Sequence, residues 1–366
     1  MRPRQRMHRF YAATSRALAI AVAALLALES GVRVLRAQDT LPPGHPRPPG
    51  RLIDVGGYRL HLYCTGTGSP TVVLVHGFGD FSFDWALVQP GVARTTRVCS
   101  YDRAGQAWSD VGPEPRGLAR ITDELHALLQ RSGEKGPFVL VGQSWGGLIP
   151  RLYVAKYRQQ VAGVVFVDAS VPDMWMWLNG VTCQPRLASD SLWNRIWPRR
   201  RPNWQPPPSP ARPTDTAYVT NDTTTPRLES PFDRLPIQAQ RYQNWAQRLT
   251  PAALVGGDWS DIREDFRAVH RVEAGPAHPF GAIPVIVLSA GRDDFEDAPE
   301  ASAAAQRAEF DRGHRALANL STNARRIIVL SSGHRIQLDE PDLVIEAIRQ
   351  VLQASRTTSP LCCRDP

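Results

Sequence analysis

Cysteine and lysine are scarce in this sequence of 366 residues. Five cysteines are present, and none has the paired C-x-x-C spacing of a zinc site, so no metal is expected. Lys135 and Lys156 are the only lysines, which leaves arginine to supply nearly all of the positive charge. Apolar residues (42%) and charged residues (21%) balance as in ordinary globular proteins, which excludes collagen, coiled coil and wholesale disorder.

Most of the chain also lacks a strongly basic surface. The formal net charge is +8, but residues 1–37 hold seven arginines against Glu29 and so account for +6 of it. The remaining +2 is too small for a surface that binds the phosphates of DNA or RNA. We therefore expect no nucleic-acid partner.

The N-terminus has the pattern of an export segment. Arginines at positions 2, 4, 6 and 9 precede a 12-residue apolar run over residues 17–28. Because a bilayer span needs about 20 apolar residues, residues 1–37 are predicted to be a signal peptide, with a membrane anchor as the alternative. The expected location is periplasmic, extracellular or membrane-anchored, and a cytoplasmic protein is the other hypothesis. Residues 38–50 are predicted to form a proline-rich linker.

From residue 51 the sequence alternates between strand and helix patterns. Residues 71–76 form an apolar, β-branched run typical of a strand buried on both faces, and residues 118–129 repeat leucine and isoleucine on one helical face that Gly133 should end. The expected strands cover residues 51–55, 58–65, 71–76, 96–101, 138–141, 161–167, 283–290 and 326–330. The alternation predicts an α/β fold with a mainly parallel sheet, whose ligands bind beyond the carboxyl ends of the strands.

This alternation predicts a core in two pieces with an insertion between them. Residues 51–169 and 281–356 carry the core pattern, whereas residues 170–280 are rich in tryptophan, proline and arginine and show no regular period. The insertion leaves the sheet at the end where ligands bind, so it is expected to form a cap or lid. Its tryptophans either line an apolar substrate site or pack within the cap. Residues 357–366 are expected to be a flexible tail.

Gly142, Ser144 and Gly146 form a G-x-S-x-G motif between an expected strand and an expected helix. In that context the motif predicts a nucleophile elbow, a tight turn that projects the serine hydroxyl into the pocket while the glycines leave room for the turn to close. The helix that begins here also directs free N–H groups at developing negative charge. Ser144 is therefore the predicted nucleophile, and an ordinary turn serine is the alternative.

A second loop, residues 76–79 (HGFG), ends an earlier strand. It can present the backbone N–H of Phe78 toward the nucleophile. Together with the backbone N–H of Trp145, it would make an oxyanion hole with two donors. A simple tight turn is the other interpretation of the His76-Gly77 pair.

His334 is the predicted general base. It follows the strand at 326–330 through a short loop, so it stands at the carboxyl end of the sheet, and Gly333 gives it backbone freedom. His314 falls in a helical stretch and His278 lies beside a proline, so neither has a comparable position.

The base needs a carboxylate that orients it, and Asp294 is the residue predicted for this role. It follows the strand at 283–290, with Asp293 as its neighbour and second choice. Asp168 is a third candidate because it also follows a strand, at 161–167, but a hydrogen-bonding turn is the role favoured for it.

The order Ser144, Asp294, His334 is that of the α/β hydrolases, and the sequence resembles this superfamily over about residues 51–354. The resemblance rests on HGFGD at 76–80, YDRAGQAWSD at 101–110, GQSWGG at 142–147, VDAS at 167–170, GRDD at 291–294 and SGHRIQLDEP at 332–341. It implies an α/β-hydrolase fold, with an eight-stranded, mainly parallel sheet, helices on both faces and a cap between strands 6 and 7. It also implies that Cys64 and Cys99 lie on adjacent strands, close enough for a disulfide.

The resemblance implies a serine hydrolase, most simply a carboxylesterase that acts on a small-molecule acyl substrate and needs no cofactor. Dehalogenases and epoxide hydrolases of this superfamily use aspartate as nucleophile, and Ser144 argues against both. Some similarity to proline iminopeptidases keeps an aminopeptidase open, although acidic residues that would hold a substrate amine cannot be matched one by one. The candidates for that role are Glu229, Asp233, Glu264 and Glu273. C–C bond hydrolysis, perhydrolysis and a non-catalytic ligand-binding protein are the remaining alternatives.

Overall fold

The computed structural model describes residues 46–178, 180–196, 228–249, 262–292, 303–357 and 359–361. The predicted export segment and Asp294 lie outside these residues, as do most of the linker and of the C-terminal tail. Within the described ranges, no helix is long and apolar enough to cross a membrane.

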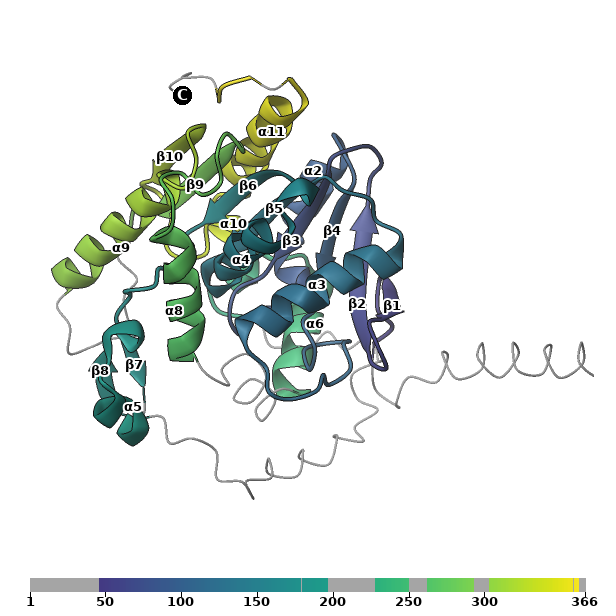
Figure 1. Cartoon of the computed structure of the whole chain (residues 1–366). Helices are drawn as coiled ribbons and strands as arrows, with labels where there is room; N and C mark the ends of the chain where they lie inside the picture. Colours follow the sequence, from purple (N-terminus) through teal and green to yellow (C-terminus); the bar gives the residue numbers. More distant parts are fainter. Residues whose placement is uncertain are drawn as a thin grey trace, which may run out of the picture. The chain divides into compact units, whose positions relative to one another are not determined.

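An eight-stranded sheet forms the centre of the molecule (Figure 1). Its strands in spatial order are β1 (Arg51–Asp54), β2 (Arg59–Thr65), β4 (Val98–Tyr101), β3 (Thr71–Val75), β5 (Phe138–Gln143), β6 (Val161–Val167), β9 (Val285–Ala290) and β10 (Ala324–Val329). From β4 to β10 all neighbours are parallel, and β2 pairs antiparallel with both β1 and β4. This confirms the predicted α/β-hydrolase fold and the mainly parallel sheet of eight strands.

Helices cover both faces of the sheet because its central strands are apolar on both sides. On β3, Val73 and Val75 belong to one buried cluster with α3 and α4, while Val72 and Leu74 belong to another with α2 and α11. The helices are α2 (Gln89–Ala93), α3 (Leu118–Ser132), α4 (Leu148–Tyr157), α5 (Asp190–Ile196), α6 (Ile237–Leu249), α8 (Ile262–Glu273), α9 (Ala303–Ala318), α10 (Ile336–Asp339) and α11 (Pro341–Thr357). Gly133 ends α3 in the left-handed conformation, as expected.

The strand order changes direction beside β3, and this change locates the site. The chain passes from β3 to β4 on one side and then to β5 on the other, and the order continues through β6 and β9. Folds with such a change of direction bind their ligands beyond the carboxyl ends of the strands beside it, here β3 and β5.

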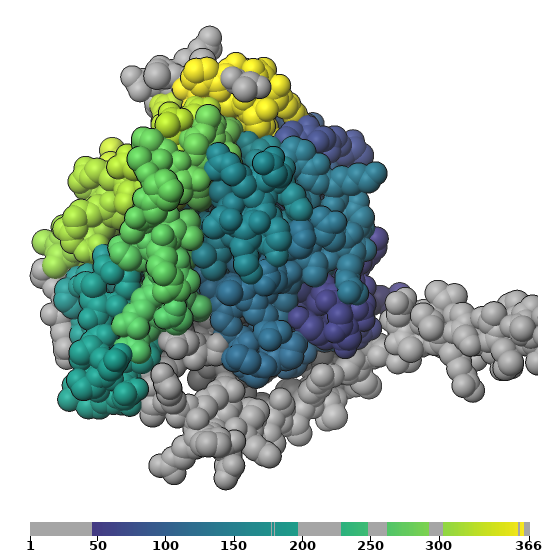
Figure 2. Space-filling model, in the orientation of Figure 1, coloured from purple at the N-terminus to yellow at the C-terminus, as the bar shows by residue number. Residues whose placement is uncertain are grey.

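The segment between β6 and β9 holds the insertion expected from the sequence. Its described elements include the hairpin of β7 (Met176–Leu178) and β8 (Val181–Cys183), together with α5, α6 and α8. Helix α8 packs on α4, and Figure 2 shows its green surface between those of α9 and α3. Trp193 and Trp245 are buried in hydrophobic clusters, so these two of the insertion's tryptophans serve packing.

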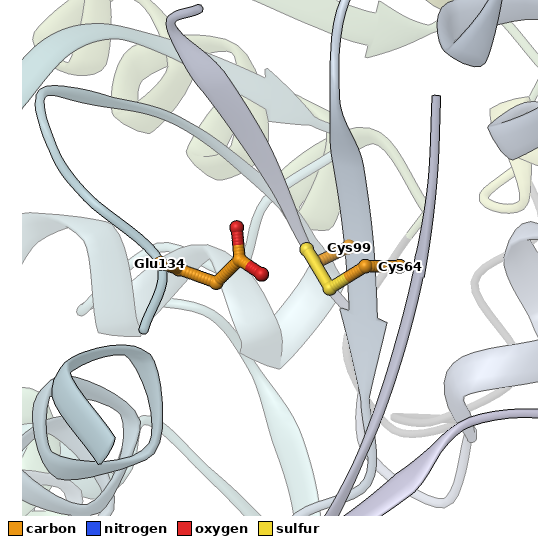
Figure 3. A group of neighbouring side chains, drawn as sticks. All are labelled: Cys64, Cys99 and Glu134. Carbon is orange, nitrogen blue, oxygen red and sulfur yellow. A yellow bond between two sulfur atoms is a disulfide. The ribbon is translucent and has the colours of Figure 1, made fainter. Parts of the chain in front are cut away.

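A disulfide joins β2 and β4, the second and third strands of the sheet. Cys64 on β2 and Cys99 on β4 are direct partners in the antiparallel register, and their sulfurs are bonded, as the family resemblance implied (Figure 3). The Glu134 carboxylate lies beside them and accepts two hydrogen bonds from Arg97, at 2.7 Å each. Both sulfurs and the carboxylate are thus already engaged, so this cluster offers no thiolate to a metal ion.

The disulfide should contribute measurably to stability. It closes a loop of 35 residues, and the resulting loss of chain entropy in the unfolded state corresponds to about 2–4 kcal/mol. Replacing both Cys64 and Cys99 by alanine should lower the urea midpoint accordingly, and dithiothreitol should have the same effect on the wild-type protein. The control is Cys183→Ala, which removes a buried cysteine that forms no disulfide. Equal midpoints for the double variant and this control would contradict the prediction.

Candidate active site

Ser144 stands on a sharp turn at the end of a fully buried strand. Strand β5 ends at Gln143, Ser144 adopts a left-handed backbone with φ of 51°, and a short 3₁₀ turn (Ser144–Gly147) leads into α4. The glycines are sterically required here. A Cβ on Gly142 would lie 2.7 Å from the Cα of Gly147, and one on Gly146 would lie 2.2 Å from the carbonyl oxygen of His76. The expected arrangement of strand, turn and helix is therefore present.

The structure brings Ser144 and His334 into hydrogen-bond contact. The Nε2 atom of His334 lies 2.8 Å from the Oγ atom of Ser144. His334 comes from the loop between β10 and α10, 190 residues further along the chain. The side chain of His334 is 38% exposed, so its imidazole ring is accessible to a substrate.

Asp168 is the carboxylate that contacts the other nitrogen of His334. Its Oδ2 atom lies 2.6 Å from Nδ1 of His334. Asp294, the residue chosen from the sequence, lies outside the described residues. Asp168, which the sequence analysis ranked third, therefore takes the place expected for Asp294. The strand order explains this, because β6 lies between β5 and β9, so the residue after β6 is next to the elbow.

The backbone of Asp168 is strained in the same way as that of Ser144. Asp168 has a φ of 41°, and the N–H of Ser170 donates to the carbonyl of Ser144 at 2.9 Å, which ties the two turns together. The backbone N–H of Ala290 donates to Oδ1 of Asp168 at 2.8 Å. Strained non-glycine backbone persists only where its surroundings hold it, and it is concentrated at functional sites.

Electrostatics keep Asp168 charged and make His334 more basic. Burial favours the neutral form of Asp168, but the hydrogen bond and positive charge of His334 outweigh it, so the pKa of this carboxyl is lowered. Partial burial acts to lower the pKa of His334, but the hydrogen bond and charge of Asp168 more than compensate, so its pKa is raised above the ordinary value. The pair therefore stabilises an imidazolium, which is what a general base becomes when it accepts a proton.

The loop that follows β3 passes directly against the nucleophile. A Cβ on Gly77 would lie 3.1 Å from the Cβ of Ser144 and 2.2 Å from Oε1 of Gln143, so only glycine fits at this position. Phe78 follows on this loop, and Trp145 is the first residue after the nucleophile. The proposal that the amides of Phe78 and Trp145 form the oxyanion hole stays a prediction.

Arg103 is a buried residue whose importance the sequence analysis missed. Its guanidinium donates to the carbonyl oxygens of His76 and Gly77, at 2.7 Å each, and lies 4.9 Å from the centre of the Trp145 ring. In a trans peptide the N–H points away from the C=O. Because Arg103 holds the carbonyls of His76 and Gly77, the N–H groups of the next residues point away from Arg103. The signal was present in the YDRAG segment, but a sequence does not reveal which carbonyls an arginine reaches.

A second arginine, Arg335, connects the loop that carries His334 with Asp80, in the loop after β3, and with Phe232 of the insertion. The Nη1 atom of Arg335 lies 2.6 Å from Oδ1 of the buried Asp80, and its guanidinium carbon lies 4.3 Å from the centre of the Phe232 ring. Arg335 follows His334 directly, so these contacts restrain the backbone that carries the base. Arg234 of the insertion adds an ion pair with Asp339 at 3.1 Å.

A cavity beside Ser144 is lined by residues of the insertion and of β9, α9 and β10. Ser144, Asp168 and His334 line it together with the apolar side chains of Met174, Trp175 and Phe310. Charged side chains line it as well, those of Arg292, Arg307, Asp311 and Arg326. Of the tryptophans in the insertion, Trp175 is thus one that faces the site, as one of the two interpretations expected. A serine, a histidine and a carboxylate in this contact are the groups that attack a carbonyl carbon in serine hydrolases.

Comparison with known proteins supports the same grouping. A family model described as the alpha/beta hydrolase family matches residues 72–347. An AB hydrolase superfamily protein from Gibberella zeae is 23% identical over 303 residues, which cover 78% of this chain and 87% of that protein. An esterase from Thermogutta terrifontis has a TM-score of 0.55 at 22% sequence identity and covers 83% of this chain and 98% of its own, which shows the shared fold.

Several curated relatives are matched over less than half of their own length. The probable transporter efuK from Hormonema carpetanum is 33% identical over 127 residues, which cover 32% of this chain but 18% of that protein. Such matches show a shared part of the chain and do not transfer a whole protein's activity.

Arg103 should be needed to keep the oxyanion loop in place. Lysine keeps the positive charge but cannot donate to two carbonyls in the same fork, so Arg103→Lys should let the loop shift. We expect Ser144 to react about 100-fold more slowly with a fluorophosphonate probe, because small misplacements near reacting atoms have effects of this size. Arg131→Lys is the matched control, since Arg131 makes an exposed ion pair with Asp54. Equal labelling rates for both variants would show that Arg103 has no such role.

Proposed function

The chain belongs to the alpha/beta hydrolase family and is a hydrolase, and from this premise we propose that it is a serine esterase whose triad is Ser144, His334 and Asp168. The observation that carries the proposal is the continuous hydrogen-bonded relay, 2.8 Å from Ser144 to His334 and 2.6 Å from His334 to Asp168. The order along the chain differs from the one predicted, because the carboxylate follows β6 rather than β9.

The relay supports a mechanism with two steps. The Oγ atom of Ser144 attacks the acyl carbon while Nε2 of His334 takes its proton, and Asp168 stabilises the resulting imidazolium through the hydrogen on Nδ1. His334 then returns the proton to the oxygen of the leaving alcohol, which leaves an acyl-enzyme. In the second step His334 takes a proton from water, the hydroxide attacks the acyl carbon, and Ser144 recovers its hydrogen as the acid departs.

Negative charge on the carbonyl oxygen needs donors that are already in position. The amides of Phe78 and Trp145 are proposed for this role, and Arg103 orients the loop that carries the first of them. Donors of this kind contribute about 3 kcal/mol each to the stability of the transition state. Arg103 also stacks on the ring of Trp145, and this contact would fix the position of one donor relative to the other.

The lining of the cavity favours an ester over a substrate with a free amine, because its three arginines (Arg292, Arg307 and Arg326) outnumber its two carboxylates (Asp168 and Asp311). None of the four acidic residues considered for an amine site is among the described residues that line the cavity. Glu264 is paired with Arg271 and Glu273 with the buried Arg151, so both negative charges are already balanced. The apolar side chains in the lining instead suit an uncharged acyl or alcohol group.

The strained backbone of Ser144 and Asp168 favours an enzyme over a non-catalytic binding protein. Both Ser144 and Asp168 have positive φ values, a conformation that disfavours residues with a Cβ, by about 1–3 kcal/mol each. A reaction that depends on the position of both side chains explains why the fold retains this strain.

The nucleophile can be tested directly by covalent labelling. Wild-type protein should react with a fluorophosphonate probe and hydrolyse p-nitrophenyl esters, whereas Ser144→Ala should do neither. Activity should fall by about 10⁶-fold, as expected when a triad serine is removed. A panel of esters from acetate to palmitate would then report the acyl length that the cavity accepts. Equal labelling of both proteins would refute the assignment of Ser144.

The identity of the carboxylate can be tested through the pH profile. His334 must be neutral to act, so kcat/KM should rise with pH through a pKa above the ordinary histidine value. Asp168→Asn should lower kcat by about 10³–10⁴-fold and move this limb to lower pH, because the group that raises the pKa is removed. Asp294→Asn is the comparison variant. If it lowers kcat more than Asp168→Asn does, then Asp294 is the orienting carboxylate and the present assignment is wrong.

A further inference from the structure

A group of polar residues lies next to Asp168 and lines the same cavity as His334. It consists of His314 on α9, Ser289 on β9 and Arg326 on β10. His314 is 2% exposed and makes no contact with the reacting serine in the mechanism described above. Arg326 is partly exposed and also pairs with Asp311 at 2.6 Å, so three neighbouring elements place hydrogen-bonded polar side chains beside Asp168.

The chemistry of the partners determines where each hydrogen lies. Nε2 of His314 is 2.9 Å from the carbonyl oxygen of Ala169, which can only accept, so Nε2 carries the hydrogen. Burial lowers the pKa of His314 and keeps the ring neutral, so Nδ1 must accept, and the hydroxyl of Ser289 donates to it at 2.9 Å. Nε of Arg326 donates to the same hydroxyl oxygen at 2.9 Å.

The end of this chain of hydrogen bonds is the peptide next to the strained aspartate. Ala169 follows Asp168 directly, and its carbonyl is the group that His314 holds. Arg151 holds the next carbonyl, that of Ser170, at 2.6 Å. The backbone just beyond Asp168 is therefore restrained by two buried side chains, while Ala290 and His334 hold the carboxylate itself.

Helix α9 can deliver this histidine because it packs very closely on the turn after β6. A Cβ on Gly313 would lie 2.3 Å from Cγ1 of Val171, so a larger residue would push the helix away. His314 Nδ1 lies 3.9 Å from Oδ1 of Asp168, which is beyond hydrogen-bond distance. The histidine thus contacts the backbone rather than the carboxylate.

We propose that His314 is a positioning residue for the triad, which acts by holding the Ala169 carbonyl so that the strained Asp168 keeps its carboxylate aimed at His334. This inference depends on the proposed function. Neutrality of the ring is part of the role, because an imidazolium at this distance would compete with His334 for the charge of Asp168.

Two amide substitutions separate this role from simple packing. The amide nitrogen of glutamine can approximate the position of histidine Nε2, so His314→Gln should keep the bond to Ala169 and retain at least a third of the wild-type kcat. Asparagine is one methylene shorter and cannot reach, so His314→Asn should lower kcat by about 10–100-fold, the usual loss for a residue that orients a site group, with KM changed less than twofold. His126→Leu is the control, since that ring stacks on Tyr157 elsewhere on the surface.

A spectroscopic measurement reports the triad independently of turnover. The hydrogen on Nδ1 of His334 should give a low-field proton NMR resonance in the wild-type protein and in His314→Gln. It should broaden or move upfield in His314→Asn, while thermal unfolding shows that the variant is folded. Should His314→Asn fail to fold, the glutamine variant decides, because a more than tenfold loss of kcat in folded His314→Gln would overturn the proposal.

A double-variant cycle distinguishes failure of this inference from failure of the proposed function. If His314 acts through Asp168, combining His314→Asn with Asp168→Asn should lower kcat no further than Asp168→Asn alone. Unchanged kcat and an unchanged resonance in His314→Asn would overturn the inference while the esterase assignment stands. Full activity in Asp168→Asn would instead refute the triad itself.

Discussion

The pairing of β5 with β6 is the constraint on which the site depends. Gln143 and Val167 are partners in the parallel register, so the residues that follow them, Ser144 and Asp168, leave the sheet side by side. Both turn sharply through left-handed backbone, and the hydrogen bond from Ser170 to Ser144 joins the two turns. A register shift between these strands would separate the nucleophile from its carboxylate, whatever the side chains were.

Two arginines hold the loops on either side of this pair, the buried Arg103 and the partly exposed Arg335. Arg103 donates to two carbonyls of the loop for which we propose the oxyanion role, and Arg335 pairs the loop that carries His334 with Asp80. Arginine suits such positions because its planar fork makes several fixed hydrogen bonds and keeps its charge when buried. The scarcity of lysine in the sequence thus coincides with a site whose loops are held by guanidinium groups.

The insertion packs on the core and also contributes residues to the cavity beside Ser144. Its helix α6 packs through Trp245 and Ala246 on an aromatic cluster that includes Trp108 and Phe83, while Met174 and Trp175 face the nucleophile. The turns of the sheet hold Ser144 and Asp168, and residues of the insertion and of α9 line the cavity beside them. This division is typical of folds that carry many activities on one scaffold.

The sequence by itself determined the eight strands, the elbow at Ser144 and the position of His334 at a strand end, because these depend on local patterns of apolar residues, glycines and turns. It led to Asp294 as the orienting carboxylate, whereas Asp168 lies 2.6 Å from His334 in the structure. Both residues follow strands, and the spatial order of the strands, which the sequence does not reveal, places β6 next to the elbow. His314 was passed over for a similar reason. Its helical context says nothing about a carbonyl 145 residues away along the chain, which only packing brings within reach.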